Sequence, residues 1–255
     1  MTFDPHSLIL MLAILIMAIL YSSVGHAGAS GYLAVMALMG VAPEIMKPTA
    51  LTLNILVALI ASWKFCRIGA FSWRLFWPLA ITSVPMAWLG GYLVLPAIFY
   101  QPLVGLVLLY AAWHSFFPAQ NIAGTVQSAR LPVLMLAGAL LGLLSGLTGV
   151  GGGIFLSPLL LLMRWAEIKV ISGIAAVFIL LNSSAGLLGL VASGEQHLPA
   201  ALPLWALAAV IGGFIGAELG SRYLANKTIK KLLGVVLLIA GGKMLLASGL
   251  ITPLA

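Results

Sequence analysis

The residues best suited to chemistry form one run of small residues between two apolar stretches. The run reads Ser145-Gly146-Leu147-Thr148-Gly149-Val150-Gly151-Gly152-Gly153. Each glycine inside a helix costs about 1 kcal/mol relative to alanine, so the run predicts a break between two helices. N–H groups at helix ends carry partial positive charge and attract anions. We therefore expect a substrate site for an anion that uses Ser145, Thr148, Gly149, Gly151, Gly152 and Gly153.

A weaker copy of this run occurs near the start of the chain. It reads Ser22-Ser23-Val24-Gly25-His26-Ala27-Gly28-Ala29-Ser30-Gly31. Two breaks, one in each half of the chain, are typical of transporters whose binding sites are built from broken helices. The alternative is that the glycines only allow close helix packing. On the first interpretation the substrate also contacts Ser22, Ser23, His26, Gly28, Ser30 and Gly31.

Three isolated polar side chains lie in apolar surroundings: His26, Asn54 and Asn182. The two amides can donate hydrogen bonds to an anion without the desolvation cost of a charge, so we expect them in the site. The alternative is a hydrogen bond between helices. A neutral His26 donates to an oxyanion, and a protonated one couples transport to protons. Its alternative is a histidine at a helix end, in contact with water.

Three charged residues near the C-terminal end are candidates for a gate or for ion coupling. Glu218 and Arg222 are four residues apart on one expected helix and therefore face each other. Such a pair is either structural or a gate that opens when it separates. Lys243 lies well inside the last apolar segment. It either attracts an anion or extends its stem to the membrane surface.

The composition identifies the class of protein. Of the 255 residues, 63% are hydrophobic and only 7% are charged, whereas soluble domains carry about 25% charged residues. The chain is therefore expected to be a polytopic membrane protein in contact with the lipid bilayer. Its basic residues are distributed between the apolar runs, so the net charge of +7 does not indicate a nucleic-acid partner. A single cysteine, Cys66, excludes an internal disulfide.

Ten apolar segments divide the chain, and all are expected to be helical. They span 7–24, 28–41, 48–65, 73–95, 101–117, 131–148, 153–164, 170–192, 200–221 and 229–249. A helix needs about 20 residues to cross a bilayer. The second and seventh segments are shorter, and each follows a glycine break. They are predicted to be half-helices or re-entrant arms, although the sequence leaves a full crossing open.

The two halves of the chain repeat the same order of segments. Leu103-Val104-Gly105 in the first half corresponds to Leu232-Leu233-Gly234 in the second. Asn54 and Asn182 lie in corresponding segments. We therefore expect one transporter domain over residues 1–255, with one repeat at 7–117 and the other at 131–249.

The basic residues predict that the two repeats are inverted. Lys64, Arg67 and Arg74 flank the loop after the third segment, whereas the corresponding loop of the second half has no Lys or Arg. One loop later the order reverses: residues 96–100 are uncharged, and basic residues crowd the corresponding loop, namely Arg222, Lys227, Lys230 and Lys231. Cytoplasmic loops collect Lys and Arg. The expected fold is an all-α membrane protein of two inverted repeats with about five helical segments each.

These features together resemble the sulfite exporter TauE/SafE family of bacterial inner-membrane permeases. The resemblance rests on the run from Ser145 to Gly153, on Gly216-x-x-x-Gly220 and on the basic stretch from Arg222 to Lys231. The first half departs from the family pattern, since Gly28-Ala29-Ser30-Gly31 replaces the glycine triplet. The resemblance implies a multi-pass protein of the bacterial inner membrane that moves small sulfur-containing anions, such as sulfite, thiosulfate and sulfoacetate.

The expected function is therefore secondary transport of a small anion, without enzymatic activity. No nucleotide-binding motif occurs, so energy would come from a proton or sodium gradient or from partner proteins. No metal-spaced cluster of His and Cys occurs, and we expect no cofactor or metal. Two alternatives remain: an intramembrane serine hydrolase built on Ser145, and a membrane anchor subunit of a larger complex. The sequence indicates a class of substrate rather than one compound, and neither the direction of transport nor the oligomeric state.

Overall fold

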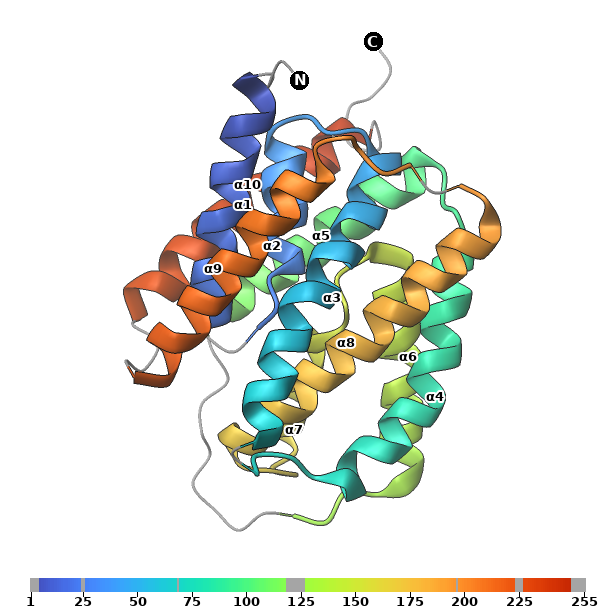
Figure 1. Cartoon of the computed structure of the whole chain (residues 1–255). Helices are drawn as coiled ribbons and strands as arrows, with labels where there is room; N and C mark the ends of the chain where they lie inside the picture. The colour runs from blue at the N-terminus through green and yellow to red at the C-terminus, as the bar shows by residue number, and fades with distance from the viewer. Residues whose placement is uncertain are drawn as a thin grey trace.

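The computed structural model describes residues 5–23, 26–67, 69–117, 127–195, 197–222 and 227–248, with only the backbone for residues 220–222 and 227–230. Within these ranges the chain forms ten α-helices (Figure 1). They are α1 (Pro5–Ser23), α2 (Ala29–Leu38), α3 (Pro43–Arg67), α4 (Trp73–Tyr92), α5 (Ala97–Phe116), α6 (Leu131–Thr148), α7 (Gly153–Leu162), α8 (Ile168–Ser193), α9 (Leu202–Arg222) and α10 (Lys227–Ala247). The predicted all-α fold is confirmed.

Each predicted apolar segment corresponds to one helix, and the largest differences are at helix starts. Helix α3 begins at Pro43, five residues before the predicted start at 48. The apolar run begins later because Glu44 and Lys47 are charged. Six of the described helices are long and apolar enough to cross a membrane: α1, α3, α5, α6, α8 and α9.

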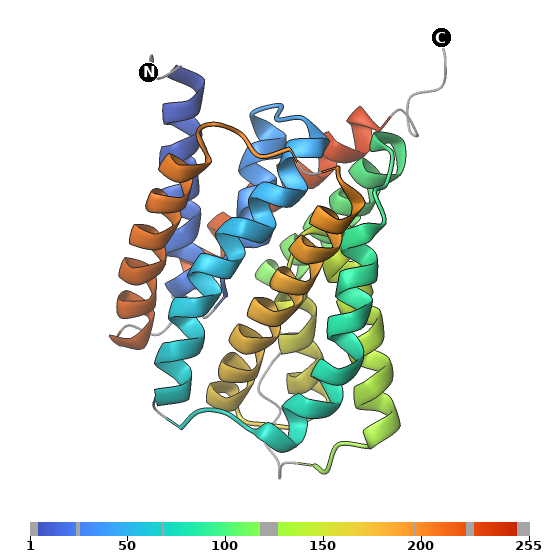
Figure 2. The same cartoon turned by 45° about the vertical axis from the view of Figure 1, so that its right-hand side comes forward.

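Helices α2 and α7 are half the length that a bilayer requires. Each has ten residues and is therefore about 15 Å long, against a hydrocarbon core of about 30 Å. Figure 2 shows that α2 turns back toward the end of the molecule where α1 begins, and that α7 turns back toward the end where α6 begins. Both short helices therefore start in the interior of the protein.

Close contacts between glycine and backbone hold the peripheral helices together. Helix α4 lies along α6, and α1 lies along α9. A Cβ atom at Gly146 of α6 would overlap the backbone of Ala87, and one at Gly216 of α9 would overlap the backbone of Ile19. Small residues let helix backbones approach in this way, so Gly146 and Gly216 serve helix packing.

Helices α3 and α8 form the centre of the structure. They pack against each other and are the most buried of the six candidate spans. In Figure 1 the two helices cross the middle of the molecule side by side. They carry Asn54 and Asn182, which are 1% and 0% exposed. Two of the three isolated polar side chains singled out in the sequence therefore lie on the two central helices.

The packing predicts a contrast between two alanine substitutions. Gly216→Ala places a methyl group against the backbone of α1, so we expect a lower melting temperature in detergent. Gly242→Ala in α10 is the matched control, because a Cβ atom there meets nothing within 4 Å. Replacing an unhindered helical glycine stabilises by up to about 1 kcal/mol. Equal melting temperatures for the two variants would contradict the close contact between α1 and α9.

Candidate functional site

Three glycines in left-handed conformations make the break between α6 and α7. Gly149, Gly151 and Gly152 have φ values of 82°, 81° and 78°. Gly149 ends α6, and Gly152 is the N-cap of α7. Residues with a Cβ adopt this conformation only at a cost, so the glycines allow the chain to reverse within a few residues. The helix break predicted from the glycine run is confirmed.

The first half contains a similar start of a short helix. Gly28, with a φ of 104°, is the N-cap of α2. Neither Gly28 nor Gly152 is accompanied by a side-chain cap. In the described part of the chain, the N–H groups of Ala29, Ser30 and Gly31 have no hydrogen-bond partner, nor do those of residues 151–154. Both short helices therefore begin with N–H donors that no described residue satisfies.

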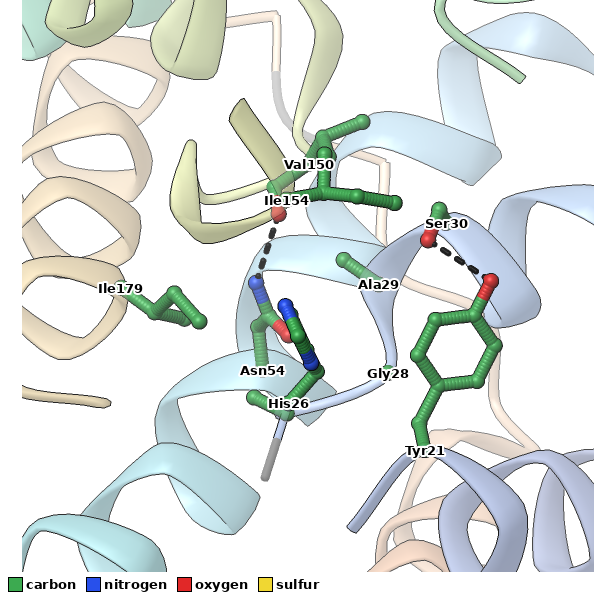
Figure 3. A pocket seen from close by; sticks show the side chains of 10 residues that line it. Tyr21, His26, Gly28, Ala29, Ser30, Asn54, Val150, Ile154 and Ile179 are labelled. Carbon is green, nitrogen blue, oxygen red and sulfur yellow. Dashed lines mark hydrogen bonds between the residues drawn. The ribbon is translucent and has the colours of Figure 1, made fainter. Parts of the chain in front are cut away.

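These two helix starts line the same pocket. Its walls come from both breaks and from the two central helices (Figure 3): Tyr21, His26, Ala27, Gly28, Ala29, Ser30, Asn54, Val150, Ile154 and Ile179. The pocket is narrow, with room for roughly one water molecule. Three of the predicted site residues from the first break, His26, Gly28 and Ser30, are brought together here with Asn54.

Asn54 connects α3 to the second break and to α8. Its Nδ2 atom donates to the carbonyl oxygen of Val150 at 3.2 Å and to Oγ of Ser183 at 3.1 Å. Its Oδ1 atom is buried and has no hydrogen-bond partner among the described residues. The sequence suggested that this amide donates to the substrate. In the structure both donors are used by the protein, and the group left over is an acceptor.

Tyr21 is a pocket residue that the sequence analysis did not select. Oγ of Ser30 donates to the hydroxyl oxygen of Tyr21 at 3.0 Å, and both side chains are buried. A tyrosine hydroxyl can accept one hydrogen bond and still donate its own proton. Its signal in the sequence was an aromatic hydroxyl at the end of an apolar segment, directly before the first break.

The other candidates near the first break lie outside the pocket lining. Oγ of Ser23 donates to the carbonyl of Leu20 within α1. Ser22 is 8% exposed, and Gly31 packs closely against the ring of Tyr21. None of these three residues lines the pocket.

The predicted residues of the second break lie outside the pocket lining. Thr148 donates through Oγ1 to the carbonyl of Leu144 at 2.7 Å and accepts from the N–H of Val150 at 3.3 Å. Ser145 is fully buried in α6. The three glycines 151–153 pack against the side chains of Asn54, Phe178 and Ile179. Asn182 donates to the carbonyl of Phe178 in its own helix at 2.8 Å.

The charged candidates lie away from the pocket. Glu218 is 3.4 Å from Nζ of Lys64 on α3, at a partly exposed position. The side chain of Arg222 lies outside the described residues, so the predicted pair with Glu218 stays a prediction. Nζ of Lys243 donates to the carbonyl of Leu38 at 2.8 Å. Lys243 therefore satisfies the last residue of α2, where a cation is favoured by the helix dipole.

Lys47 is the main structural residue that sequence reasoning missed. It is 6% exposed, and its Nζ donates to the carbonyl oxygens of Gly90, Gly91 and Leu93 at 3.0, 3.0 and 3.2 Å. These carbonyls close the C-terminal end of α4, where no intrahelical donor remains. A Cβ atom at Gly149 would lie 3.5 Å from Cγ of Lys47. One lysine therefore joins α3, the end of α4 and the second glycine break.

This arrangement predicts a large effect of substituting Lys47. Lys47→Met keeps the length of the stem but leaves three carbonyls without a donor, so we expect a loss of about 2 kcal/mol or more. Lys47→Arg, which restores donors and charge, should recover part of this loss. Melting curves in detergent measure both variants. If Lys47→Met melts like the wild type, the contacts with the end of α4 contribute nothing to stability.

Comparisons with known proteins agree with the geometry of a membrane carrier. The profile of a protein family described as "Sulfite exporter TauE/SafE" matches residues 10–244. The chain is 40% identical over 246 residues to a "Probable membrane transporter protein y4hK" of Sinorhizobium fredii, covering 95% of this chain and 99% of the relative.

Two more distant relatives carry similar descriptions. A "Probable membrane transporter protein MJ0441" of Methanocaldococcus jannaschii is 24% identical over 210 residues, which is 78% of each chain. A "Probable membrane transporter protein YunE" of Bacillus subtilis is 32% identical over 107 residues, or 41% of this chain and 37% of the relative. No solved structure gives a significant match.

Proposed function

The chain belongs to the sulfite exporter TauE/SafE family, and on this premise we propose that it carries a small sulfur oxyanion or sulfonate through the pocket between α2 and α7. Membership makes it a multi-pass membrane transporter and not an enzyme. The interpretation of Ser145 as the nucleophile of a serine hydrolase is therefore abandoned. The class of anion is our proposal, based on the family description and on the pocket.

The observation that carries this proposal is the meeting of two uncapped helix starts at one buried pocket. The N-terminus of a helix is equivalent to about half a positive charge, and its free N–H groups point outward along the axis. Inside a membrane protein such donors require a partner. An oxyanion supplies several acceptor oxygens and negative charge at once. The Tyr21 hydroxyl adds a further donor from α1.

The narrow pocket corresponds to a closed state in the proposed cycle. Space for roughly one water molecule does not hold a sulfur oxyanion. The substrate must therefore separate the half-helices from α3 and α8 on one side of the membrane at a time. Lys64 and Glu218 tie the end of α3 to α9, and we propose this contact, with Arg222, as a gate. We also keep Lys243 as a candidate for ion coupling, because its hydrogen bond to Leu38 would link α10 to movement of α2.

The inverted repeat remains part of the proposal and has structural support. If α1 corresponds to α6 and α4 to α9, exchanging the halves converts the α4–α6 contact into the α9–α1 contact. The pairs α3–α8 and α5–α10 map onto themselves. Figure 2 shows that α1 and α6 begin at opposite ends of the molecule. These relations are those expected of two units related by an axis in the membrane plane.

Reporter fusions test the orientation. Fusions after Trp73 and near Lys227 should both report the cytoplasm, and one at Glu195 should report the outer side, because basic loops stay inside. A fusion to a cytoplasmic loop of a known membrane protein calibrates the signal. If the fusions after Trp73 and at Glu195 report the same side, the halves are not inverted.

The remaining parts of the proposal concern location and coupling. We propose a bacterial inner membrane as the location, as the resemblance to this family implies. His26 lines the pocket, and a histidine changes charge near neutral pH. We therefore propose a proton as the coupling ion ahead of sodium.

A carboxylate built into the pocket tests the anion site directly. Ser30→Asp puts a negative charge at the start of α2, where a helix tolerates it. Two like charges about 4 Å apart repel by about 4 kcal/mol at an effective dielectric constant near 20, so affinity for sulfite or thiosulfate should fall at least about a hundredfold. Titration calorimetry on protein with a normal melting curve measures this loss.

Ser72→Asp is the matched control for this experiment. Ser72 is the N-cap of α4 and does not line the pocket, so the same carboxylate at this helix start should leave anion affinity unchanged. Normal binding by the Ser30→Asp variant would place the anion site elsewhere. Equal losses in both variants would show that the effect comes from overall charge.

A further inference from the structure

We propose that Oδ1 of Asn54 accepts a hydrogen bond from the substrate, so that the pocket selects monoanions carrying an O–H or N–H group, such as the O–H form of hydrogensulfite. This inference rests on the proposed anion site between α2 and α7 and specifies which anions it prefers. It makes Asn54 a specificity-determining residue through its acceptor rather than its donors.

The orientation of the Asn54 amide is fixed by its neighbours. The two ends of an amide group are similar in size, and only hydrogen bonding distinguishes them. The carbonyl oxygen of Val150 can only accept, so the amide end that lies 3.2 Å from it must be the NH₂ group. The second N–H is directed to Oγ of Ser183. Oδ1 must therefore point away from the second break.

The amide oxygen faces the pocket and has no partner in the described part of the protein. Asn54 is 1% exposed and is one of the pocket-lining residues. In Figure 3 the oxygen lies on the side of His26, away from Val150. A buried acceptor without a hydrogen bond costs about 1–3 kcal/mol. A ligand that donates to this oxygen removes that cost.

The pocket therefore offers two kinds of polar group to a ligand. The starts of α2 and α7 and the Tyr21 hydroxyl offer donors for anionic oxygens. Asn54 offers one acceptor, its Oδ1 atom. A fully ionised oxyanion has no hydrogen to donate and therefore forms no hydrogen bond with this oxygen. An anion with one attached hydrogen matches both. A singly charged anion also loses less hydration than a doubly charged one when it leaves water.

Two ligands of equal charge and similar size test this preference. Sulfamate and methanesulfonate are both monoanions of the form X–SO₃⁻ near neutral pH, and X is NH₂ in the first and CH₃ in the second. Titration calorimetry on the purified full-length protein at one fixed pH gives both affinities. Holding the pH constant keeps the charge of His26 the same for both ligands. Sulfamate should bind about five- to tenfold more tightly, because only it donates to Oδ1.

Asn54→Leu supplies the second comparison. The substitution removes the acceptor at nearly constant volume, so the preference for sulfamate should fall to about one. A melting curve on the same preparation reports whether the variant is folded, and the wild-type comparison stands without it.

Each outcome has a distinct meaning. Equal affinities in the wild type overturn the role of Oδ1 while leaving the anion site intact. A preference for sulfamate that persists in a folded Asn54→Leu variant assigns the acceptor to another residue and also overturns the proposal. Absence of binding by both ligands and by sulfite contradicts the proposed function itself.

Discussion

Backbone N–H groups in the interior of a membrane protein need hydrogen-bond partners, and the rest of this structure depends on that requirement. Lipid offers no hydrogen bonds, so a helix that starts halfway across must place its first donors against protein, water or ligand. Helices α2 and α7 both start there. Their donors converge on a pocket enclosed by α1, α3 and α8. The long helices separate this polar interior from lipid. The glycine contacts between α4 and α6 and between α1 and α9 let these helices pack closely.

Helix α3 links this polar interior to the rest of the protein. Asn54 holds the second break through Val150, and Lys47, seven residues earlier on the same helix, holds the end of α4. Residues seven apart lie on nearly the same face of a helix. Near its other end, Lys64 contacts Glu218 of α9. Movement of α3 would therefore alter the break, the end of α4 and the contact with α9 together.

The sequence predicted the helices and the breaks because glycine runs and apolar lengths are local signals. The segments 28–41 and 153–164 were predicted to be half-helices from their short lengths, and both contain a helix of ten residues. The roles of Lys47 and Asn54 depended on tertiary contacts. The three carbonyl partners of Lys47 belong to α4, and no spacing around Lys47 indicates them. The amide of Asn54 is oriented by a carbonyl 96 residues away, so the sequence identified a polar residue that lines the pocket but not how its amide is oriented there.

The two central asparagines make different hydrogen bonds in the two halves of the chain. Asn54 reaches across to the other half, whereas Asn182 donates within its own helix. In a carrier with two equivalent halves, the states open to either side would bind the substrate equally well. At the proposed site the substrate would meet the amide of α3 but not that of α8, so the dissociation constants on the two sides of the membrane would differ. Net flux still follows the combined gradients. The inequality instead makes the carrier saturate at different substrate concentrations in its two directions, and uptake and release then run at unequal speeds.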